Sequence, residues 1–187
     1  MLMTNKIDVA FFKKYFDVSE MVSTDHAKVK VREVIVPGRL YTIQRLFICE
    51  AEGVMHKVGD APECSVMLAV MYLFNRFGRG DVLVFLADVG EIESCAEALQ
   101  SLHDCVLCPL HSKSSCYERK QALTPHSYKW KIILATNIAE ISLTIAGVKF
   151  VIDYLIEKCP PHLKKVPISK ASHLQREGRA GRCDDGV

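Results

Sequence analysis

Residues 80–87 have the sequence GDVLVFLA, and this stretch decides the fold class. Gly80 and Asp81 favour a turn, and the apolar residues that follow show none of the polar alternation of a half-exposed strand. A continuous apolar run of this length is typical of a parallel strand that is covered on both faces. We therefore expect residues 82–87 to form a central strand of an α/β domain.

Strand and helix patterns alternate on both sides of this run. Before it, apolar residues recur at helical spacing from Val66 to Phe77, with Ser65 as the expected N-cap. After it, the patterns predict helices over residues 91–102 and 116–123 and strands over 106–110, 131–135 and 149–153. Such alternation predicts right-handed β-α-β crossovers, and hence a doubly wound parallel sheet flanked by helices on both faces.

The N-terminal part is less regular. Aromatic and lysine residues at helical spacing predict a short helix over residues 8–16, and alternation predicts strands over 29–36 and 41–48. The polar stretch 50–62 is expected to be a loop.

The composition fits a globular domain with enough apolar material for a core, since the chain has 187 residues, 49% hydrophobic and 25% charged. The longest unbroken apolar run, residues 66–74, is less than half the length that crosses a bilayer, and no secretory signal pattern precedes it. We therefore expect no membrane contact and an intracellular location, cytoplasmic or nuclear.

Eight cysteines are scattered through apolar segments, which favours reduced, buried thiols. Cys105 and Cys108, with His103 and His111 nearby, leave a zinc or redox site open as the less favoured interpretation. Both cysteines fall in a strand-like stretch, where residues three apart point to opposite faces. We expect them to diverge, and we predict no metal site.

Charge is distributed unevenly. The net charge is only +2, but residues 158–182 carry seven Lys or Arg against one acid. The positive charge therefore gathers near one end of the sequence, where a phosphate-bearing partner would be met.

Residues 175–182, QREGRAGR, hold the strongest chemical pattern. In a continuous helix Gln175, Arg179 and Arg182 would form one stripe, at spacings i, i+4 and i+7. Two guanidinium groups and an amide suit a triphosphate, because guanidinium offers a planar fork of donors and stays charged. Gly178 and Gly181 cost about 1 kcal/mol each in a helix, and close approach of another backbone or a ligand would explain them. Composition alone favours a solvated basic helix instead.

A second pattern, ATNIAEISLTI at residues 135–145, follows a predicted strand. Thr136 and Asn137 place a hydroxyl and an amide at the strand's carboxyl end, where they suit contacts to phosphate and sugar that do not depend on base sequence. Taken alone, the stretch also fits an ordinary polar turn between strand and helix.

Together these stretches resemble the DEAH-box RNA helicases. Residues 175–182 are similar to motif VI of superfamily 2 helicases, QRxGRxGR, and the preceding ISKAS at 168–172 is typical of the DEAH-box branch. Residues 135–145 are similar to motif V, ATNIAETSLTI, with Ile141 in place of threonine. Weaker matches occur in the expected order: residues 83–93 resemble motif IV, VFLxGxxEIE, with Asp88 in place of glycine, and residues 36–39 resemble the PGR segment between the two motor domains.

The resemblance implies a RecA-like fold and two parts. Residues 39–187 would be the second RecA-like domain, with motifs IV, V and VI, and residues 1–38 the tail of the first RecA-like domain with the linker. In the family the equivalents of Gln175, Arg179 and Arg182 face ATP, with the arginines as fingers on its phosphates, and the Ser142 region senses nucleotide. Those of Thr136 and Asn137 lie against the RNA backbone. ATP and Mg²⁺ would be held mainly by the first RecA-like domain, which with RNA is the expected partner.

The chain also departs from the family pattern. Motif III, usually Ser-Ala-Thr, is replaced by Thr4, Asn5 and Lys6, and Ala146 stands where an aspartate approaches the nucleotide. The segment 154–167 is shorter than the family's β-hairpin, which acts as a wedge against the duplex, and Pro160-Pro161 predicts that a hairpin there would be cramped.

The sequence contains neither a GKT or GKS loop nor a DEAH motif, so the chain alone is not expected to hydrolyse ATP. The favoured hypothesis is part of an ATP-dependent RNA helicase that supplies arginine fingers and RNA-backbone contacts for unwinding or remodelling. The alternative is a catalytically inactive, helicase-derived RNA- or protein-binding module.

Overall fold

A computed structural model describes residues 41–47, 62–124, 129–141, 145–159, 164–180 and 186–187, together with Ala10 and Lys14. The chain divides into two units, Met1–Arg39 and Leu40–Val187, and the fold below belongs to the second. Ala10 and Lys14 are both helical, as expected for residues 8–16. The rest of that helix, the strand over 29–36 and residues 4–6 lie outside the described residues. The assignment of residues 1–38 and 39–187 to two RecA-like domains stays a prediction.

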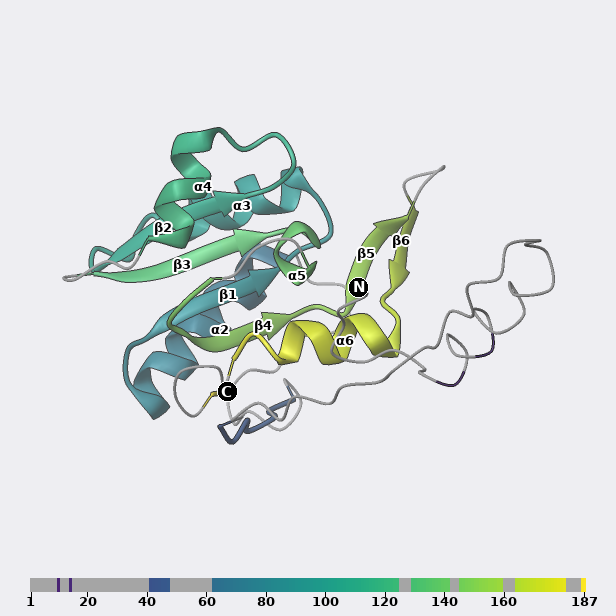
Figure 1. The fold of residues 1–187 in the computed structure, drawn as a ribbon. Helices are drawn as coiled ribbons and strands as arrows, with labels where there is room; N and C mark the ends of the chain where they lie inside the picture. Colours follow the sequence, from purple (N-terminus) through teal and green to yellow (C-terminus); the bar gives the residue numbers. More distant parts are fainter. Residues whose placement is uncertain are drawn as a thin grey trace. The chain divides into compact units, whose positions relative to one another are not determined.

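Four parallel strands form the main sheet, in the order β2-β3-β1-β4 (Figure 1). They are β1 (Asp81–Phe85), β2 (Cys105–Leu110), β3 (Trp130–Ala135) and β4 (Val148–Asp153). Because the strand order departs from the chain order, crossovers must run over both faces of the sheet. The predicted RecA-like doubly wound sheet is confirmed.

Helices cover both faces of this sheet (Figure 1). On one face, α2 (Pro62–Phe77) and α3 (Val89–Leu99) pack on Val82 and Val84. On the other, α4 (Cys116–Leu123) and α5 (Ile138–Ile141) pack on Leu83 and Phe85. The side chains of β1 thus alternate between two buried clusters, which explains its uninterrupted apolar run. None of the described helices is long and apolar enough to span a bilayer.

Helix ends differ from the predicted ones by a few residues. Helix α2 begins at Pro62 instead of after Ser65, which is buried within it. Proline near the start of a helix loses no intrahelical hydrogen bond, so Pro62 is compatible with the first turn. Helix α3 is N-capped by Asp88, which accepts a hydrogen bond from the main-chain nitrogen of Glu91, and it ends at Leu99.

The two cysteines of β2 lie on opposite faces of the sheet, as predicted. Cys105 packs against the cluster under α2 and α3, and Cys108 is buried in the cluster under α4 and α5. Burial raises the pKa of Cys108 to about 11, so its thiol stays protonated at neutral pH. Among the described residues, no group of three or more His, Cys, Asp or Glu side chains is placed to hold a metal ion.

A hairpin follows β4, contrary to the expectation that prolines would cramp it. Strands β5 (Ile156–Cys159) and β6 (Lys164–Pro167) pair antiparallel. Pro160 and Pro161 come after the last paired residue of β5, so neither removes a donor from the ladder. Pro167 stands at the end of β6 opposite Ile156, where a missing donor costs little.

The stretch predicted as a strand over 41–48 pairs at one point within its described part, 41–47. Ile43 forms a parallel bridge with Gly186, and Val187 pairs with β4 through Lys149 and Val151. Residues far apart in the chain therefore extend the sheet beyond β4 in the parallel sense.

Helix α4 buries one residue, Ala122, so packing contributes little to it and its N-terminal cap matters more. The Ser115 hydroxyl accepts a hydrogen bond from the Glu118 nitrogen at 3.2 Å, and the Glu118 carboxylate accepts one from the Ser115 nitrogen at 2.6 Å. Ser115→Ala is expected to lower the free energy of unfolding by about 1 kcal/mol in urea titrations. Ser101→Ala, which removes one exposed bond of 3.4 Å to Ala98, is the control and should change it by less than about 0.5 kcal/mol. Equal losses for the two variants would contradict the role of the cap.

Candidate functional site

The stretches that the sequence singles out meet at the carboxyl edge of the sheet. Phe85 at the end of β1 is paired with Ala135 at the end of β3 and with Asp153 at the end of β4. Helix α5 starts directly after β3, and α6 (Lys170–Glu177) contacts both α5 and β4 (Figure 1). In parallel sheets, ligands bind beyond this edge.

Helix α6 has a serine cap at its start and ends at Glu177, inside the stretch 175–182. The Ser169 hydroxyl accepts a hydrogen bond from the Ser172 nitrogen at 3.0 Å. After Glu177 the chain tightens, and the Arg179 nitrogen donates to the carbonyl three residues back, that of Arg176, at 3.0 Å. The condition for a single stripe is therefore not met, because Arg179 lies in a turn after the helix that holds Gln175.

The close approach of another backbone or a ligand that would explain Gly178 is not what its surroundings show. A Cβ atom there would lie 3.3 Å from the Leu174 carbonyl oxygen, which is tighter than most such contacts. The neighbour belongs to the same helix, not to a ligand.

Arg176 makes ion pairs with several acidic side chains at this edge. The sequence did not predict a role for it. Its guanidinium is 1% exposed and lies 3.1 Å from Glu140 Oε2, 3.0 Å from Asp153 Oδ1 and 3.9 Å from Glu157 Oε2. These four residues are called the Arg176 cluster below. The guanidinium carbon also lies 4.8 Å from the centre of the Phe85 ring, within the range of a cation–π contact.

The Arg176 cluster joins four elements at one point. Glu140 comes from α5, Asp153 from the end of β4, Glu157 from β5 and Arg176 from α6. Motif V, motif VI and the hairpin are thus held together through one buried cation. The sequence contained a weak indication of this, because Arg176 follows Gln175 directly and must point to another side of the helix.

Arg179 is also turned inward. It is 5% exposed, and its Nη2 donates a hydrogen bond to the main-chain carbonyl of Glu140. Glu140 therefore accepts from both arginines, from Arg176 with its side chain and from Arg179 with its backbone. Gln175, in contrast, is partly exposed.

The remaining predicted site residues are placed in part. Thr136 is half-buried at the end of β3, and its nitrogen donates to the Leu110 carbonyl at 3.2 Å. Asn137 is exposed, and its carbonyl accepts from the Glu140 nitrogen at 3.0 Å, which starts α5. Ser142 and Arg182 lie outside the described residues, so their roles stay predictions.

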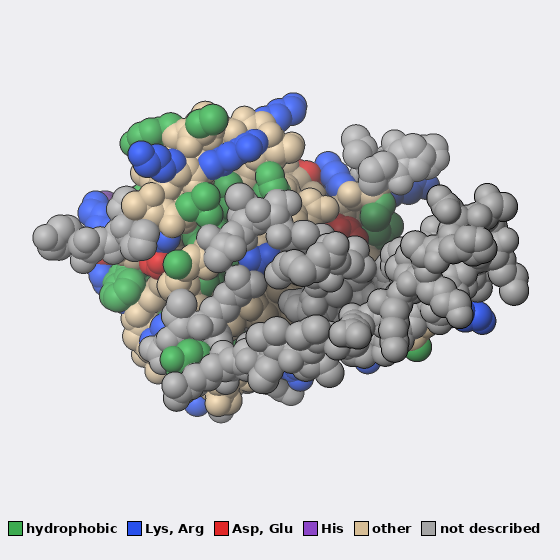
Figure 2. Space-filling model, viewed as in Figure 1, with side chains coloured by type: hydrophobic (Ala, Val, Ile, Leu, Met, Phe, Trp, Pro, Cys, Tyr) green, Lys and Arg blue, Asp and Glu red, His purple; other side chains and the backbone are tan. Residues whose placement is uncertain are grey.

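Three of the seven cationic residues expected near the C-terminal end pair with carboxylates. Arg176 is buried in its cluster, and the hairpin lysines Lys158 and Lys165 lie next to Asp88 and Glu91. Figure 2 shows acidic side chains (red) next to Lys and Arg side chains (blue) near the hairpin. Around these three residues the edge therefore presents mixed charge.

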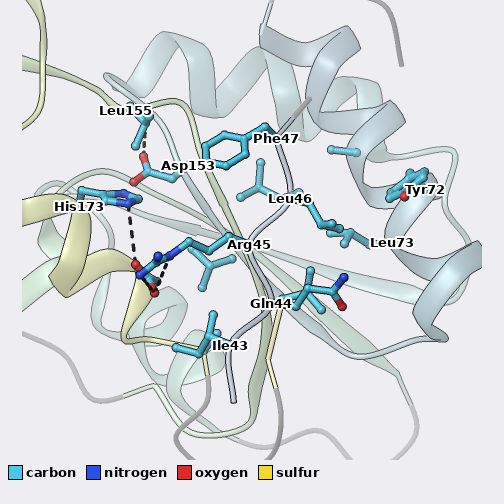
Figure 3. A pocket seen from close by; sticks show the side chains of 16 residues that line it. Ile43, Gln44, Arg45, Leu46, Phe47, Tyr72, Leu73, Asp153, Leu155 and His173 are labelled. Atoms are coloured by element: carbon cyan, nitrogen blue, oxygen red, sulfur yellow. Dashed lines mark hydrogen bonds and ion pairs between the residues drawn. The ribbon is translucent and has the colours of Figure 1, made fainter. Parts of the chain in front are cut away.

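A cavity of about 200 Å³ lies between residues 43–47, α2, β4 and α6 (Figure 3). Its lining is mostly apolar, and its polar side is closed by Glu177, which pairs with Arg45 at 2.9 Å and lies 3.8 Å from His173. Of the predicted site residues that the structure describes, Gln175, Arg179, Thr136 and Asn137 do not line it. Asp153 of the Arg176 cluster does, so the cavity borders the edge that holds the cluster.

Comparison with known proteins agrees with the resemblance to helicases that the sequence motifs carry. Residues 65–184 match the helicase conserved C-terminal domain family. The chain is 33% identical over 204 residues to the probable ATP-dependent RNA helicase DHX34 of Homo sapiens, an alignment that covers 100% of this chain and 17% of that protein. It is 40% identical over 165 residues to the ATP-dependent RNA helicase HrpB of Escherichia coli (strain K12), covering 82% of this chain and 20% of that protein.

The fold is shared with a solved relative. The crystal structure of the E. coli DExH-box NTPase HrpB superimposes with a TM-score of 0.71 and 32% sequence identity, covering 80% of this chain and 19% of that one. The chain thus spans about a fifth or less of the length of these relatives. From its motifs, its sheet and these matches, the chain belongs to the helicase conserved C-terminal domain family, among the DEAH-box ATP-dependent RNA helicases.

Proposed function

We propose that residues 39–187 act as the second RecA-like motor domain of an ATP-dependent RNA helicase that unwinds or remodels RNA. The observation that carries the proposal is the convergence of motifs V and VI on Glu140 at the carboxyl edge of the sheet. An RNA-facing segment and a phosphate-facing segment that share one residue would move together, which is what coupling of ATP hydrolysis to RNA movement needs.

In this proposal Arg179, Arg182 and Gln175 face the phosphates of ATP, which with Mg²⁺ is held mainly by a first RecA-like domain. The donor set fits, because guanidinium and amide groups donate to phosphate oxygens. Arg179 would exchange the neutral Glu140 carbonyl for a charged phosphate. A phosphate adds an opposite charge and can accept from two guanidinium nitrogens at once, so the exchange is favourable once phosphate is near. Ser142 would sense the nucleotide.

Thr136 and Asn137 would hold the RNA backbone. Asn137 is exposed just beyond the end of β3, and Thr136 precedes it. Their side chains can donate to phosphate or sugar oxygens, contacts that position a strand without depending on base sequence. RNA and the first RecA-like domain are therefore the proposed partners.

A catalytically inactive RNA- or protein-binding module is the second candidate. The inward position of Arg179 favours it, since a finger must leave the lobe to reach a nucleotide. Exposed Ala146, where the family has an aspartate, agrees with it.

A chimaera separates the two candidates. Residues 65–184 would replace the matching residues of E. coli HrpB, and RNA-stimulated ATP hydrolysis would be measured. We expect activity in the chimaera and a loss in kcat on the order of a thousandfold or more for Arg179→Ala. The matched control Arg79→Ala removes an exposed guanidinium that pairs with Asp104, and its activity should stay unchanged. An inactive but folded chimaera, or equal effects of the two variants, would favour the binding module. The 187-residue chain alone should show no ATP hydrolysis above background.

A further inference from the structure

The β5–β6 hairpin places two lysines directly opposite each other. Lys158 is paired with Lys165 in the antiparallel register, so their side chains share one face of the hairpin. Like charges in this position repel unless counter-charges lie nearby. Glu157, next to Lys158, points to the other face and approaches Arg176.

Two carboxylates supply those counter-charges. Asp88 Oδ2 lies 2.7 Å from Lys158 Nζ, and Glu91 Oε1 lies 2.6 Å from Lys165 Nζ. Lys165 Nζ is also 3.9 Å from Asp88 Oδ2. The pairing crosses from the hairpin to the first turn of α3.

The backbone holds both carboxylates in place independently of the lysines. Asp88 Oδ1 accepts from the Glu91 nitrogen at 3.0 Å, and Glu91 Oε2 accepts from the Ala87 nitrogen at 2.7 Å. Each acid therefore uses one oxygen for the backbone and offers the other to a lysine. The result is a fixed pair of anions that faces a pair of cations.

Each pair contains one group whose pKa shift favours the charged form, and both pairs remain open to solvent. Burial raises the pKa of Asp88, but the hydrogen bonds with Lys158 and the Glu91 backbone outweigh this, so the pKa lies below its ordinary value. The hydrogen bond to Glu91 raises the pKa of Lys165. The lysine side chains are 34% and 49% exposed, and ion pairs of this kind contribute about 0–1 kcal/mol each. Another anion can therefore displace the carboxylates.

We infer that the carboxylates of Asp88 and Glu91 lie where RNA phosphates would contact Lys158 and Lys165. RNA must therefore displace these carboxylates to bind the hairpin. The inference rests on the proposed RNA-binding function and adds a built-in competitor to it. Asp88 stands where the motif IV pattern has glycine, so one half of the competitor is a feature of this chain. Its effect would be to lower RNA affinity and to make binding less dependent on salt.

The salt dependence follows from counting ions. When an RNA phosphate replaces a carboxylate at a lysine, a salt cation leaves the RNA and another associates with the freed carboxylate. The net number of cations released is therefore small. When the acids are neutral, each lysine that meets a phosphate releases a counterion. For single strands this steepens the plot of log K against log salt by about 0.7 per lysine, or about 1.4 for two.

Asp88→Asn with Glu91→Gln is the test variant in the 187-residue chain. Asparagine is an equally good N-cap and glutamine keeps an acceptor for the Ala87 nitrogen, so the fold should hold, which urea titration checks. Binding of a single-stranded oligouridine would be measured by anisotropy over a range of KCl concentrations. We expect affinity at low salt to rise about tenfold and the slope to steepen by about 1.4.

Two controls give the result its meaning. Asp104→Asn with Glu97→Gln removes the same formal charge from exposed acids outside the hairpin pairing, and it should change neither affinity nor slope by a comparable amount. Adding Lys158→Gln and Lys165→Gln to the test variant should abolish the gain. Equal effects of the test and control variants, a gain that survives loss of the lysines, or no RNA binding even after neutralisation would each overturn the inference. The HrpB chimaera tests the proposed function separately, because Arg179 is not part of this pairing.

Discussion

Replacing Arg176 by methionine is expected to lower the free energy of unfolding by about 3–5 kcal/mol, because it leaves buried carboxylates without their counter-charge. Glu140 and Asp153 are both largely buried and both point at the guanidinium. Removing one partner of a buried ion pair costs more than the pair itself contributes, since the remaining charge cannot regain its hydration. Urea titration of the 187-residue chain, followed by circular dichroism, measures the loss.

Arg176→Lys separates charge from shape. Lysine keeps the positive charge but lacks the planar fork that reaches Glu140 and Asp153 from different nitrogens, so a smaller loss is expected. Arg79→Met is the matched control, because it removes an exposed arginine that is 2.5 Å from Asp104 and should change the stability little. A loss for Arg176→Met no larger than for Arg79→Met would show that the Arg176 cluster does not hold this edge together.

The sheet was predictable because burial leaves a direct mark on sequence. A strand covered on both faces needs apolar residues throughout, and β1 and β3 show this without exception from Val82 to Phe85 and from Ile132 to Ala135. Helix starts were less predictable, since Ser65 and Pro62 both carry start signals and the periodicity does not choose between them.

The sequence predicted which residues belong to the candidate site, but it did not predict how their side chains are placed. Spacing placed Gln175 and Arg179 on one helical stripe, but the helix ends at Glu177, and the tighter turn that follows directs Arg179 to the Glu140 carbonyl. The Arg176 cluster draws its acids from positions 140, 153 and 157, and only the assembled fold brings them to one point.

The hairpin shows the same limit. Two adjacent prolines predicted a cramped segment, but what matters is whether they fall inside the paired residues, and they follow Cys159 instead. The fold places Asp88 and Glu91 beside Lys158 and Lys165, a pairing between distant parts of the chain that the sequence pattern does not predict.

At the opposite, amino end of the sheet, Asp81→Asn is expected to cost about 3–5 kcal/mol of unfolding free energy. Lys131 is fully buried, and its Nζ lies 3.4 Å from Asp81 Oδ2 while it donates to the Ala122 carbonyl at 3.1 Å. In the wild-type chain the main-chain nitrogen of Lys131 donates to Asp81 Oδ1 at 2.9 Å, and asparagine keeps an oxygen that can accept this hydrogen bond. The substitution therefore removes the counter-charge and little else.

Lys131→Met supplies the decisive comparison. In the Asp81→Asn background it removes the uncompensated ammonium, so most of the lost stability should return, as expected when a buried pair is replaced by apolar or neutral groups of similar volume. Urea titrations of the two single variants and the double variant give the coupling energy, which should be well above the roughly 0.5 kcal/mol scatter of independent sites. If the double variant were as unstable as the sum of the singles, the pair would not interact, and the tie that Lys131 makes between β1, β3 and the end of α4 would have to rest on packing alone.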